Sequence, residues 1–253
     1  MMKNIPLGSV VIPVYSGSHL LARAIESALC QQVPLEIIVV NDASPEDVDS
    51  VMESYRNNDA VLYFKNPENI GAAESRNSGI SHSKGKYIAF LDADDCWVKG
   101  KLQKQLAVLE ESNIVLCAPG REQLLPDGTS TGRVIPVPEV ITYRDLLKHN
   151  CISCSSVVMR REVAREFPMR HAQDSHEDYI MWLEVLRKYK TARGINEPLL
   201  QYTVSNQGKS GTKRKSAAMT LRVYRHMGFG PVQSALCFCS YAVNGVWKHY
   251  IRK

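Results

Sequence analysis

Three kinds of feature are missing from this chain, and each absence excludes a class of protein. No apolar run reaches about eighteen residues, so no helix is expected to span a membrane. No basic segment followed by a long apolar stretch opens the chain, which argues against a secretory signal. The seven cysteines are odd in number and irregularly spaced, which does not suit a disulfide framework and favours a reducing cytoplasm.

Acidic side chains are also missing from one region. From residue 198 to residue 253 there is no Asp or Glu, and the same stretch carries nine Lys and Arg residues. Residues 1–197 hold 22 basic and 26 acidic side chains, a net charge of −4. A mildly acidic body with a strongly basic tail predicts an anionic partner for the tail.

One short cysteine motif could suggest a zinc site. Cys151 and Cys154 form an isolated C-x-x-C, with no second pair and no histidine at ligand spacing. We expect both to be small buried residues, as free cysteines usually are.

Apolar stretches alternate with helical patterns over the first half of the chain. Strands are expected over 9–15, 35–42, 60–64, 87–95 and 114–119, and helices over 19–31, 71–83 and 99–112, with a further helix capped by Ser44 and begun by Pro45. This order predicts an α/β fold with a parallel sheet, which binds ligands at the carboxyl ends of its strands.

The second half has a looser pattern. A hairpin or loop is expected around a Pro-Asp-Gly turn at 126–128, followed by a helix over 142–150, a strand over 152–160 and a helix over 176–189. We expect one domain over 1–205, with a first half at 1–119 and a second half at 120–205. A basic amphipathic extension would occupy 206–253.

Carboxylates follow two of the expected strands. Asp92 and Asp94 end the apolar stretch at 87–91, where carboxylates that close together repel each other. A hard divalent cation such as Mg²⁺ or Mn²⁺, shared with substrate phosphates, relieves that repulsion. Asp42 follows 35–41 and is either a turn or cap residue or an acceptor for a nucleotide base or ribose.

Two helix starts add candidate site residues. Gly71 opens one helix, with Arg76 one turn later, and a helix N-terminus and an arginine both favour phosphate. The alternative is a surface helix with a stray arginine. Glu177 and Asp178 open another helix, where acidic residues are also common because of the helix dipole alone.

In chain order, the motifs SVVIPVY, Asp42 after a strand, NIGAAESRNSG, FLDADD and EDYIMWLEVL resemble the family-2 glycosyltransferases of the GT-A fold, over about residues 8–205. The tail is similar to enzymes of bacterial teichuronic-acid and O-antigen assembly. The resemblance implies a Rossmann-like, mixed but mainly parallel sheet flanked by helices. It also implies inverting transfer of a sugar from a nucleotide diphosphate, here a UDP-sugar, to a saccharide or lipid-linked saccharide.

The resemblance makes residues 1–119 the nucleotide-sugar half and residues 120–205 the acceptor half, and it implies roles for individual residues. Asp42 would contact a uracil, Asp92 the ribose side, and Asp94 a Mg²⁺ or Mn²⁺ ion, with Asp92 beside it as second metal ligand. The nucleotide-sugar site would comprise Pro13, Tyr15, Asp42, Asn69, Gly71, Arg76, Asn77, Asp92, Ala93 and Asp94. Asp178 would be the catalytic base, with Glu177 and Trp182 on the acceptor side.

Two departures from the family pattern matter. No Q-x-x-R-W motif follows Asp178, so we expect one sugar to be added per encounter. Thr203 stands where related tails have arginine, which leaves Lys209 and Arg214 as alternatives for the residue that closes over the diphosphate.

The tail predicts a surface-binding helix. Apolar residues recur at helical spacing from Val232 to Val246, with basic residues on both sides. We expect a peripheral anchor on the anionic inner face of the cytoplasmic membrane. The alternative is a helix packed on the domain, or on a second subunit in a homodimer.

Three rival functions fit the sequence less well. A phosphatase with an aspartate nucleophile places its D-x-D strand first, whereas here that strand is fourth. A dinucleotide oxidoreductase needs a G-x-G-x-x-G that is missing. A non-catalytic nucleotide-binding or membrane-docking module would not need Asp178 as a base, and no aromatic platform suggests nucleic acid as a partner.

Overall fold

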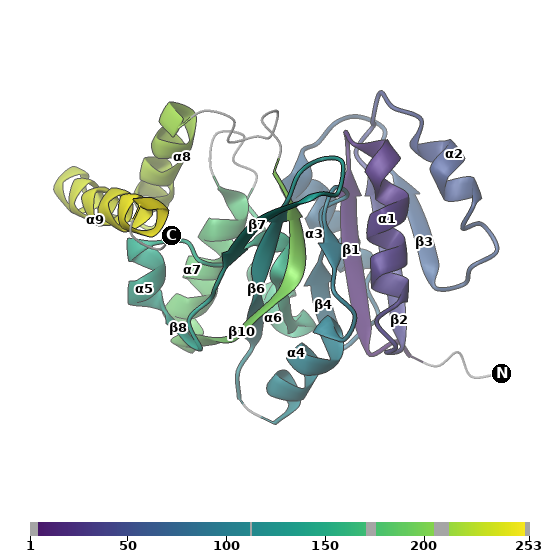
Figure 1. Cartoon of the computed structure of the whole chain (residues 1–253), viewed down its shortest axis with the longest axis horizontal. Helices are drawn as coiled ribbons and strands as arrows, with labels where there is room; N and C mark the ends of the chain where they lie inside the picture. The colour runs from purple at the N-terminus through teal and green to yellow at the C-terminus, as the bar shows by residue number, and fades with distance from the viewer. Residues whose placement is uncertain (1–4, 112, 171–175, 205–212, 251–253) are drawn as a thin grey trace.

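The computed structural model describes residues 5–111, 113–170, 176–204 and 213–250 (Figure 1). The strands are β1 (Gly8–Val14), β2 (Leu35–Asn41), β3 (Val61–Lys65), β4 (Tyr87–Phe90), β5 (Cys96–Trp97), β6 (Leu116–Leu124), β7 (Ser130–Ile135), β8 (Val140–Thr142), β9 (Val158–Arg160) and β10 (Thr191–Thr203). The helices are α1 (Ser18–Leu29), α2 (Val48–Glu53), α3 (Ala72–His82), α4 (Lys101–Glu110), α5 (Tyr143–Lys148), α6 (Arg161–Glu166), α7 (Glu177–Tyr189), α8 (Lys213–His226) and α9 (Pro231–Tyr250), with a 3₁₀ turn η1 (Cys154–Ser156).

A single mixed sheet forms the centre of the molecule. Its strand order is β3-β2-β1-β4-β9-β6-β10-β5, with β7 paired to β6 and β8 to β10. Strands β3, β2, β1 and β4 are parallel, and β10 runs parallel to β6. Strand β9 lies antiparallel between β4 and β6. The predicted α/β fold with a mixed, mainly parallel sheet is therefore confirmed.

Both faces of the sheet are covered by helices. Val10 and Ile12 of β1 belong to an apolar cluster with residues of α1 and α4 on one face. Val11, between them, belongs to a second cluster with residues of α3, α6 and α7 on the other face. This arrangement explains why the strands are apolar without alternation, since parallel strands are buried on both sides.

Helix α3 lies unusually close to β1. A Cβ atom added at Gly79 would come within 2.4 Å of Cγ1 of Val11, closer than any carbon contact allows. Only glycine therefore lets α3 approach the sheet at this point, and the approach sets the position of the N-terminal end of α3 beside the strand ends.

Three local predictions were wrong. Ser44 does not cap α2; its hydroxyl donates to the Tyr15 carbonyl at 2.6 Å, and Asp47 accepts the capping bond from Ser50 N–H. The segment expected as a strand over 152–160 begins with the 3₁₀ turn η1, and only its end forms β9. The expected strand over 87–95 ends at Phe90, so the aspartates lie on the following turn.

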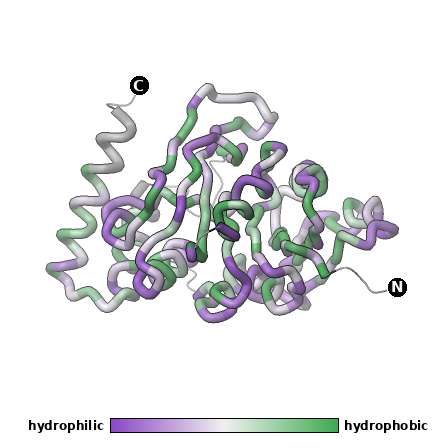
Figure 2. Tube along the Cα trace, turned by 90° about the horizontal axis from the view of Figure 1, so that it is seen from below, coloured by the Kyte–Doolittle hydropathy of each residue, from purple (hydrophilic) through white to green (hydrophobic). Residues whose placement is uncertain are grey.

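Helices α8 and α9 pack against the domain. Val223 and Met227 of α8 join the same apolar cluster as α7, and Tyr224 O–H donates to the Leu147 carbonyl at 2.7 Å. Helix α9 crosses α8 at one end of the molecule, with apolar residues recurring along it (Figure 2). No helix within the described ranges combines the length and hydropathy of a bilayer span. The expected domain boundary near residue 205 lies outside the described residues.

Candidate active site at the carboxyl ends of the strands

A pocket of about 280 Å³ lies where β1, β2 and β4 end. Its walls come from the segment after β1, the residue after β2, the first turns of α3 and the turn after β4. The lining residues are Pro13, Val14, Tyr15, Ser16, Asp42, Ala72, Arg76, Asp92, Ala93 and Asp94. The parallel strands thus bring together residues that are as many as 81 positions apart in the sequence.

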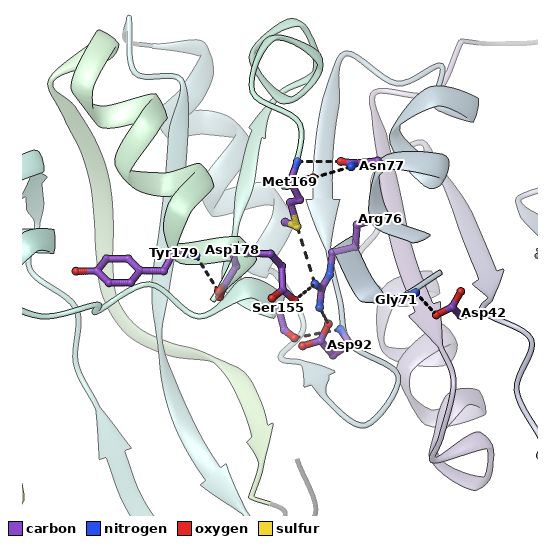
Figure 3. A network of polar contacts seen from close by, with 10 residues as sticks. Asp42, Gly71, Arg76, Asn77, Asp92, Ser155, Met169, Asp178 and Tyr179 are labelled. Atoms are coloured by element: carbon purple, nitrogen blue, oxygen red, sulfur yellow. Dashed lines mark hydrogen bonds and ion pairs between the residues drawn. The ribbon is translucent and has the colours of Figure 1, made fainter. Parts of the chain in front are cut away.

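Asp42 holds the loop that leads into α3. Its carboxylate accepts hydrogen bonds from the Ile70 N–H at 2.9 Å, the Gly71 N–H at 2.8 Å and the Asn66 side chain at 2.9 Å. Figure 3 shows Asp42 turned toward Gly71. The side chain is only 2% exposed, so its evident role is structural, and contact with a uracil would use the lone pair that remains.

Arg76 occupies the centre of the site. One Nη atom lies 2.5 Å from a carboxylate oxygen of Asp92, and the other lies 3.2 Å from a carboxylate oxygen of Glu177. Figure 3 shows the guanidinium between Asp92 and the segment that carries Asp178. Arg76 is 5% exposed, and both of its Nη groups are engaged within the protein. Arg76 therefore links Asp92 to Glu177 within the protein and is not an exposed phosphate ligand.

Two side chains, Arg23 and Thr203, fix the backbone of the turn that carries Asp94. Arg23 donates to the Asp94 carbonyl at 2.9 Å and to the Thr203 hydroxyl at 3.1 Å, and Thr203 in turn donates to the same carbonyl. The Thr203 N–H donates to the buried carboxyl of Asp95 at 2.8 Å. Burial, with the charges of Asp94 and Asp92, raises the pKa of Asp95 well above its usual range.

The Asp94 carboxylate is suited to a divalent cation. Burial and the neighbouring charge of Asp92 raise its pKa to about 6, against the smaller lowering effect of a hydrogen bond from its own backbone N–H. Within the described ranges, no group of three or more His, Cys, Asp or Glu residues could hold a metal alone. Mg²⁺ and Mn²⁺ are commonly held by one or two carboxylates plus substrate phosphates and water, so the residues present fit such an ion.

Helix α7 presents a second acidic pair beside Arg76. Glu177 is 7% exposed and paired with Arg76, so it braces the arginine, and its expected place on the acceptor side stays a prediction. Asp178 is partly exposed, and burial together with the charge of Glu177 raises its pKa. A raised pKa makes this carboxylate a better proton acceptor than an ordinary aspartate.

The side chain of Trp182 is buried in the core, so it does not contact an acceptor directly. Its side chain is fully buried and packs beside Phe90 with ring centroids 6.0 Å apart. One turn separates it from Asp178 on α7, so the residue anchors the helix that carries the candidate base. Its expected role in shaping the acceptor side stays a prediction.

Three more predicted residues lie outside the pocket. The Asn77 side chain exchanges hydrogen bonds with the Met169 backbone, at 2.7 Å and 2.9 Å, so it fastens α3 to a neighbouring loop. Gly71 contributes its N–H to Asp42. Asn69 is exposed and does not line the pocket. The family resemblance implies that all three shape the nucleotide pocket, and that role stays a prediction.

Sequence reasoning missed several supporting residues. Ser155 accepts from the Asp92 N–H at 3.0 Å, and its carbonyl accepts from the Trp97 indole at 2.7 Å. Arg23 and Thr203 hold Asp94 from elements far apart in the chain. Nothing in their local sequence marks these residues, since each contact depends on the sheet order. Of the two candidates for closing over the diphosphate, Lys209 lies outside the described residues, and Arg214 is exposed on α8.

The expected burial of the C-x-x-C cysteines is confirmed. Cys151 and Cys154 are each 8% exposed, and both are free thiols. Burial raises the pKa of Cys154 well above its usual range, which keeps it neutral beside the charged site.

A comparison with known protein families decides the class of the chain. Residues 9–167 match the model described as glycosyl transferase family 2. This chain belongs to that family. The matched segment includes every residue that lines the pocket at the strand ends, and the predicted family resemblance and glycosyltransferase activity are confirmed.

Two curated relatives cover almost the full length. The chain is 36% identical over 248 residues to a Bacillus subtilis protein named as the teichuronic acid biosynthesis glycosyltransferase TuaG, covering 96% of this chain and 97% of the relative. It is 31% identical over 244 residues to WfaP of Escherichia coli, a UDP-Glc:α-D-GlcNAc-diphosphoundecaprenol β-1,3-glucosyltransferase, covering 96% and 95%.

Solved structures show the same fold. TarS 1–349 of S. aureus, in complex with UDP-GlcNAc, matches 93% of this chain and 70% of its own with a TM-score of 0.71 at 17% identity. The mannosyltransferase PcManGT of Pyrobaculum calidifontis, in complex with GDP-Man and Mn²⁺, matches 94% and 69% with a TM-score of 0.69 at 17% identity. These likenesses confirm the predicted GT-A fold.

Proposed function

We propose that this chain is an inverting, metal-dependent glycosyltransferase that adds one sugar from a UDP-sugar to a lipid-linked saccharide in bacterial cell-surface polysaccharide biosynthesis. The observation that carries the proposal is the Arg76 bridge, which ties the donor-side Asp92 to the start of the helix that carries Asp178. Relatives named for UDP-glucose transfer to a diphosphoundecaprenol-linked sugar and for teichuronic acid biosynthesis support the substrate class.

The donor would occupy the pocket at the strand ends. Pro13 and Tyr15 would flank the base, with Asp42 beside them, while Asp92 would face the ribose. Asp94, with Asp92, would hold Mg²⁺ or Mn²⁺, which when bound supplies a positive charge that stabilises the leaving diphosphate. The Arg23 and Thr203 hydrogen bonds to the Asp94 carbonyl would keep that carboxylate in position.

Asp178 would act as the general base. An acceptor hydroxyl would attack the anomeric carbon from the face opposite the diphosphate, and Asp178 would accept its proton. The raised pKa of Asp178 suits this task. General-base catalysis typically contributes about 10²–10⁴-fold, and the transition state would have oxocarbenium character as in glycoside hydrolysis.

The tail would hold the enzyme at its acceptor. Val232, Leu236 and Val243 of α9 are 75%, 67% and 68% exposed, and their spacing places them on one face of the helix. Arg214, Arg222 and Arg225 are exposed on α8. An apolar stripe beside basic side chains suits peripheral binding to the anionic cytoplasmic face of a membrane.

The test is transfer by the purified protein to a GlcNAc-diphosphate-lipid, with a panel of UDP-sugars and Mn²⁺, followed by mass spectrometry. We expect one added hexose or related sugar, with the anomeric configuration inverted. Asp178→Asn should bind UDP normally yet turn over at least about 100-fold more slowly. Full activity in that variant would remove Asp178 as the base, and multiple added sugars would contradict single transfer.

A further inference from the structure

A second and larger cavity lies beside the candidate active site. Its volume is about 670 Å³, and it is enclosed by the β6–β7 hairpin, the segment between β7 and β8, and the end of α5. The basic residues Arg121, Arg133 and His149 line it together with an apolar wall at 134–138. None of the described residues that line it is acidic. The cavity therefore combines positive charge with apolar surface.

Arg121 is the partly buried charge of this cavity. Its Nη1 donates to the Ser153 hydroxyl at 2.6 Å, and its guanidinium lies 5.5 Å from the centre of the Tyr202 ring. Its Nε is buried without a hydrogen-bond acceptor, and the charge of Asp95 acts on the guanidinium without forming an ion pair. An unsatisfied buried donor costs free energy, which an incoming anion would recover.

One short segment, residues 153–155, is hydrogen-bonded both to the cavity and to the donor pocket. Ser153 accepts from Arg121 on the cavity side, and Ser155, two residues later, accepts from the Asp92 N–H on the donor side. A molecule bound against Arg121 is thus separated from the donor by one short segment of backbone.

The opposite side of the cavity leads toward the candidate base and the tail. The His149 ring lies 5.8 Å from the Tyr241 ring of α9, which lies 6.2 Å from the ring of Tyr179. Tyr179 follows Asp178 directly, and α9 carries the exposed apolar stripe. A ligand with one end in this cavity could therefore reach both Asp178 and a membrane surface.

We propose that this cavity binds the diphosphate of a lipid-linked acceptor, with Arg121 on the phosphate and the apolar wall at 134–138 against the first isoprenoid units. The proposal rests on the proposed function and assigns its acceptor a place. Charge-assisted contacts from arginine to phosphate are strong and geometrically specific, which suits Arg121 to this task.

The probe is farnesyl diphosphate, titrated calorimetrically into the intact protein already saturated with UDP and Mn²⁺. We expect binding to the wild type, weaker binding of inorganic pyrophosphate, and none of farnesol. Arg121→Gln should weaken farnesyl diphosphate binding at least about tenfold while UDP affinity changes less than about twofold. Arg144→Gln, an exposed arginine on α5 outside the cavity, is the matched control and should bind normally.

A second variant, Val134→Asp, tests the cavity independently in case the Arg121 variant fails to fold. Val134 is 52% exposed on the cavity wall, so an aspartate there should fold normally and repel the diphosphate. Three results would overturn the assignment. They are an unchanged affinity of both variants for farnesyl diphosphate, displacement of farnesyl diphosphate by UDP, and failure of the wild type to bind farnesyl diphosphate although it binds UDP. Absence of UDP binding by the wild type would instead count against the proposed function itself.

Discussion

At the scale of single residues, Arg76 decides how the site holds together. A guanidinium buried to this degree is tolerated because Asp92 and Glu177 compensate its charge from two sides. The strand ends and helix starts predicted Asp92, Asp94 and Asp178 as site residues. They could not predict that Arg76 is used internally, because its partner Glu177 lies 101 positions away and reaches it only in the folded chain.

Removal of Arg76 should be costly to stability. Arg76→Met would leave the buried Glu177 carboxylate and the partly exposed Asp92 carboxylate without their cation, and breaking a buried pair typically costs about 3–5 kcal/mol. Urea denaturation followed by circular dichroism measures the change. Arg56→Gln removes an exposed arginine whose side chain is 75% accessible, and we expect a change within about 0.5 kcal/mol. Equal stability of the two variants would refute the bridging role.

At the scale of elements, α3 depends on its contact with β1. The helix has little amphipathic character in its sequence, yet Gly79 brings it against the buried Val11. Close packing at this point places Arg76, one turn earlier, at the strand ends. The predicted extent of α3 from sequence was right to within a residue at each end because glycines bracket the segment.

Gly79→Ala should therefore destabilise the protein. The added methyl would gain about 0.5–1 kcal/mol of helix propensity, whereas overpacking a core typically costs about 1–3 kcal/mol. With only 2.4 Å available to Val11, we expect the overpacking cost to win in thermal unfolding measurements. Gly230→Ala is the control, since no heavy atom lies within 4 Å of its added Cβ. A more stable Gly79→Ala protein would show that α3 shifts freely.

Other elements resisted prediction for physical reasons. Strand β10 is 13 residues long, but Pro198 interrupts its apolar pattern, and the pairing with β6 shifts register around that residue. The turn η1 has a strand-like composition, yet its backbone curves so that Ser155 meets Asp92. Pairings of this kind depend on distant partners, which local periodicity does not encode.

At the scale of the whole molecule, the tail packs part of its surface on the domain and leaves another part exposed. Helix α8 contributes Val223 to the main core, and Tyr241 of α9 packs against the same cluster, as the packed alternative for the C-terminal helix predicts. Helix α9 keeps an apolar stripe turned outward, as the proposed membrane anchor requires. The sequence indicated the stripe and the charge, but the seating of Tyr241 between His149 and Tyr179 appears only in three dimensions.

The exposed stripe should be needed for membrane binding. Replacing Val232, Leu236 and Val243 together with serine should lower flotation with phosphatidylglycerol vesicles at least about tenfold, because each lost apolar side chain weakens insertion. A triple serine variant at the exposed residues Ile5, Leu125 and Val140 is the matched control and should float normally. Equal flotation of both variants, or wild-type binding to uncharged vesicles as strong as to anionic ones, would refute this anchor.

The central claim is that a nucleotide diphosphate binds with a metal at the turn after β4. Calorimetric titration of the wild type and Asp94→Asn with UDP, each with and without Mn²⁺, tests it most directly. We predict tight binding by the wild type only when Mn²⁺ is present, and loss of that dependence in Asp94→Asn. UDP binding that is unaffected by Mn²⁺ or by the substitution would contradict the account.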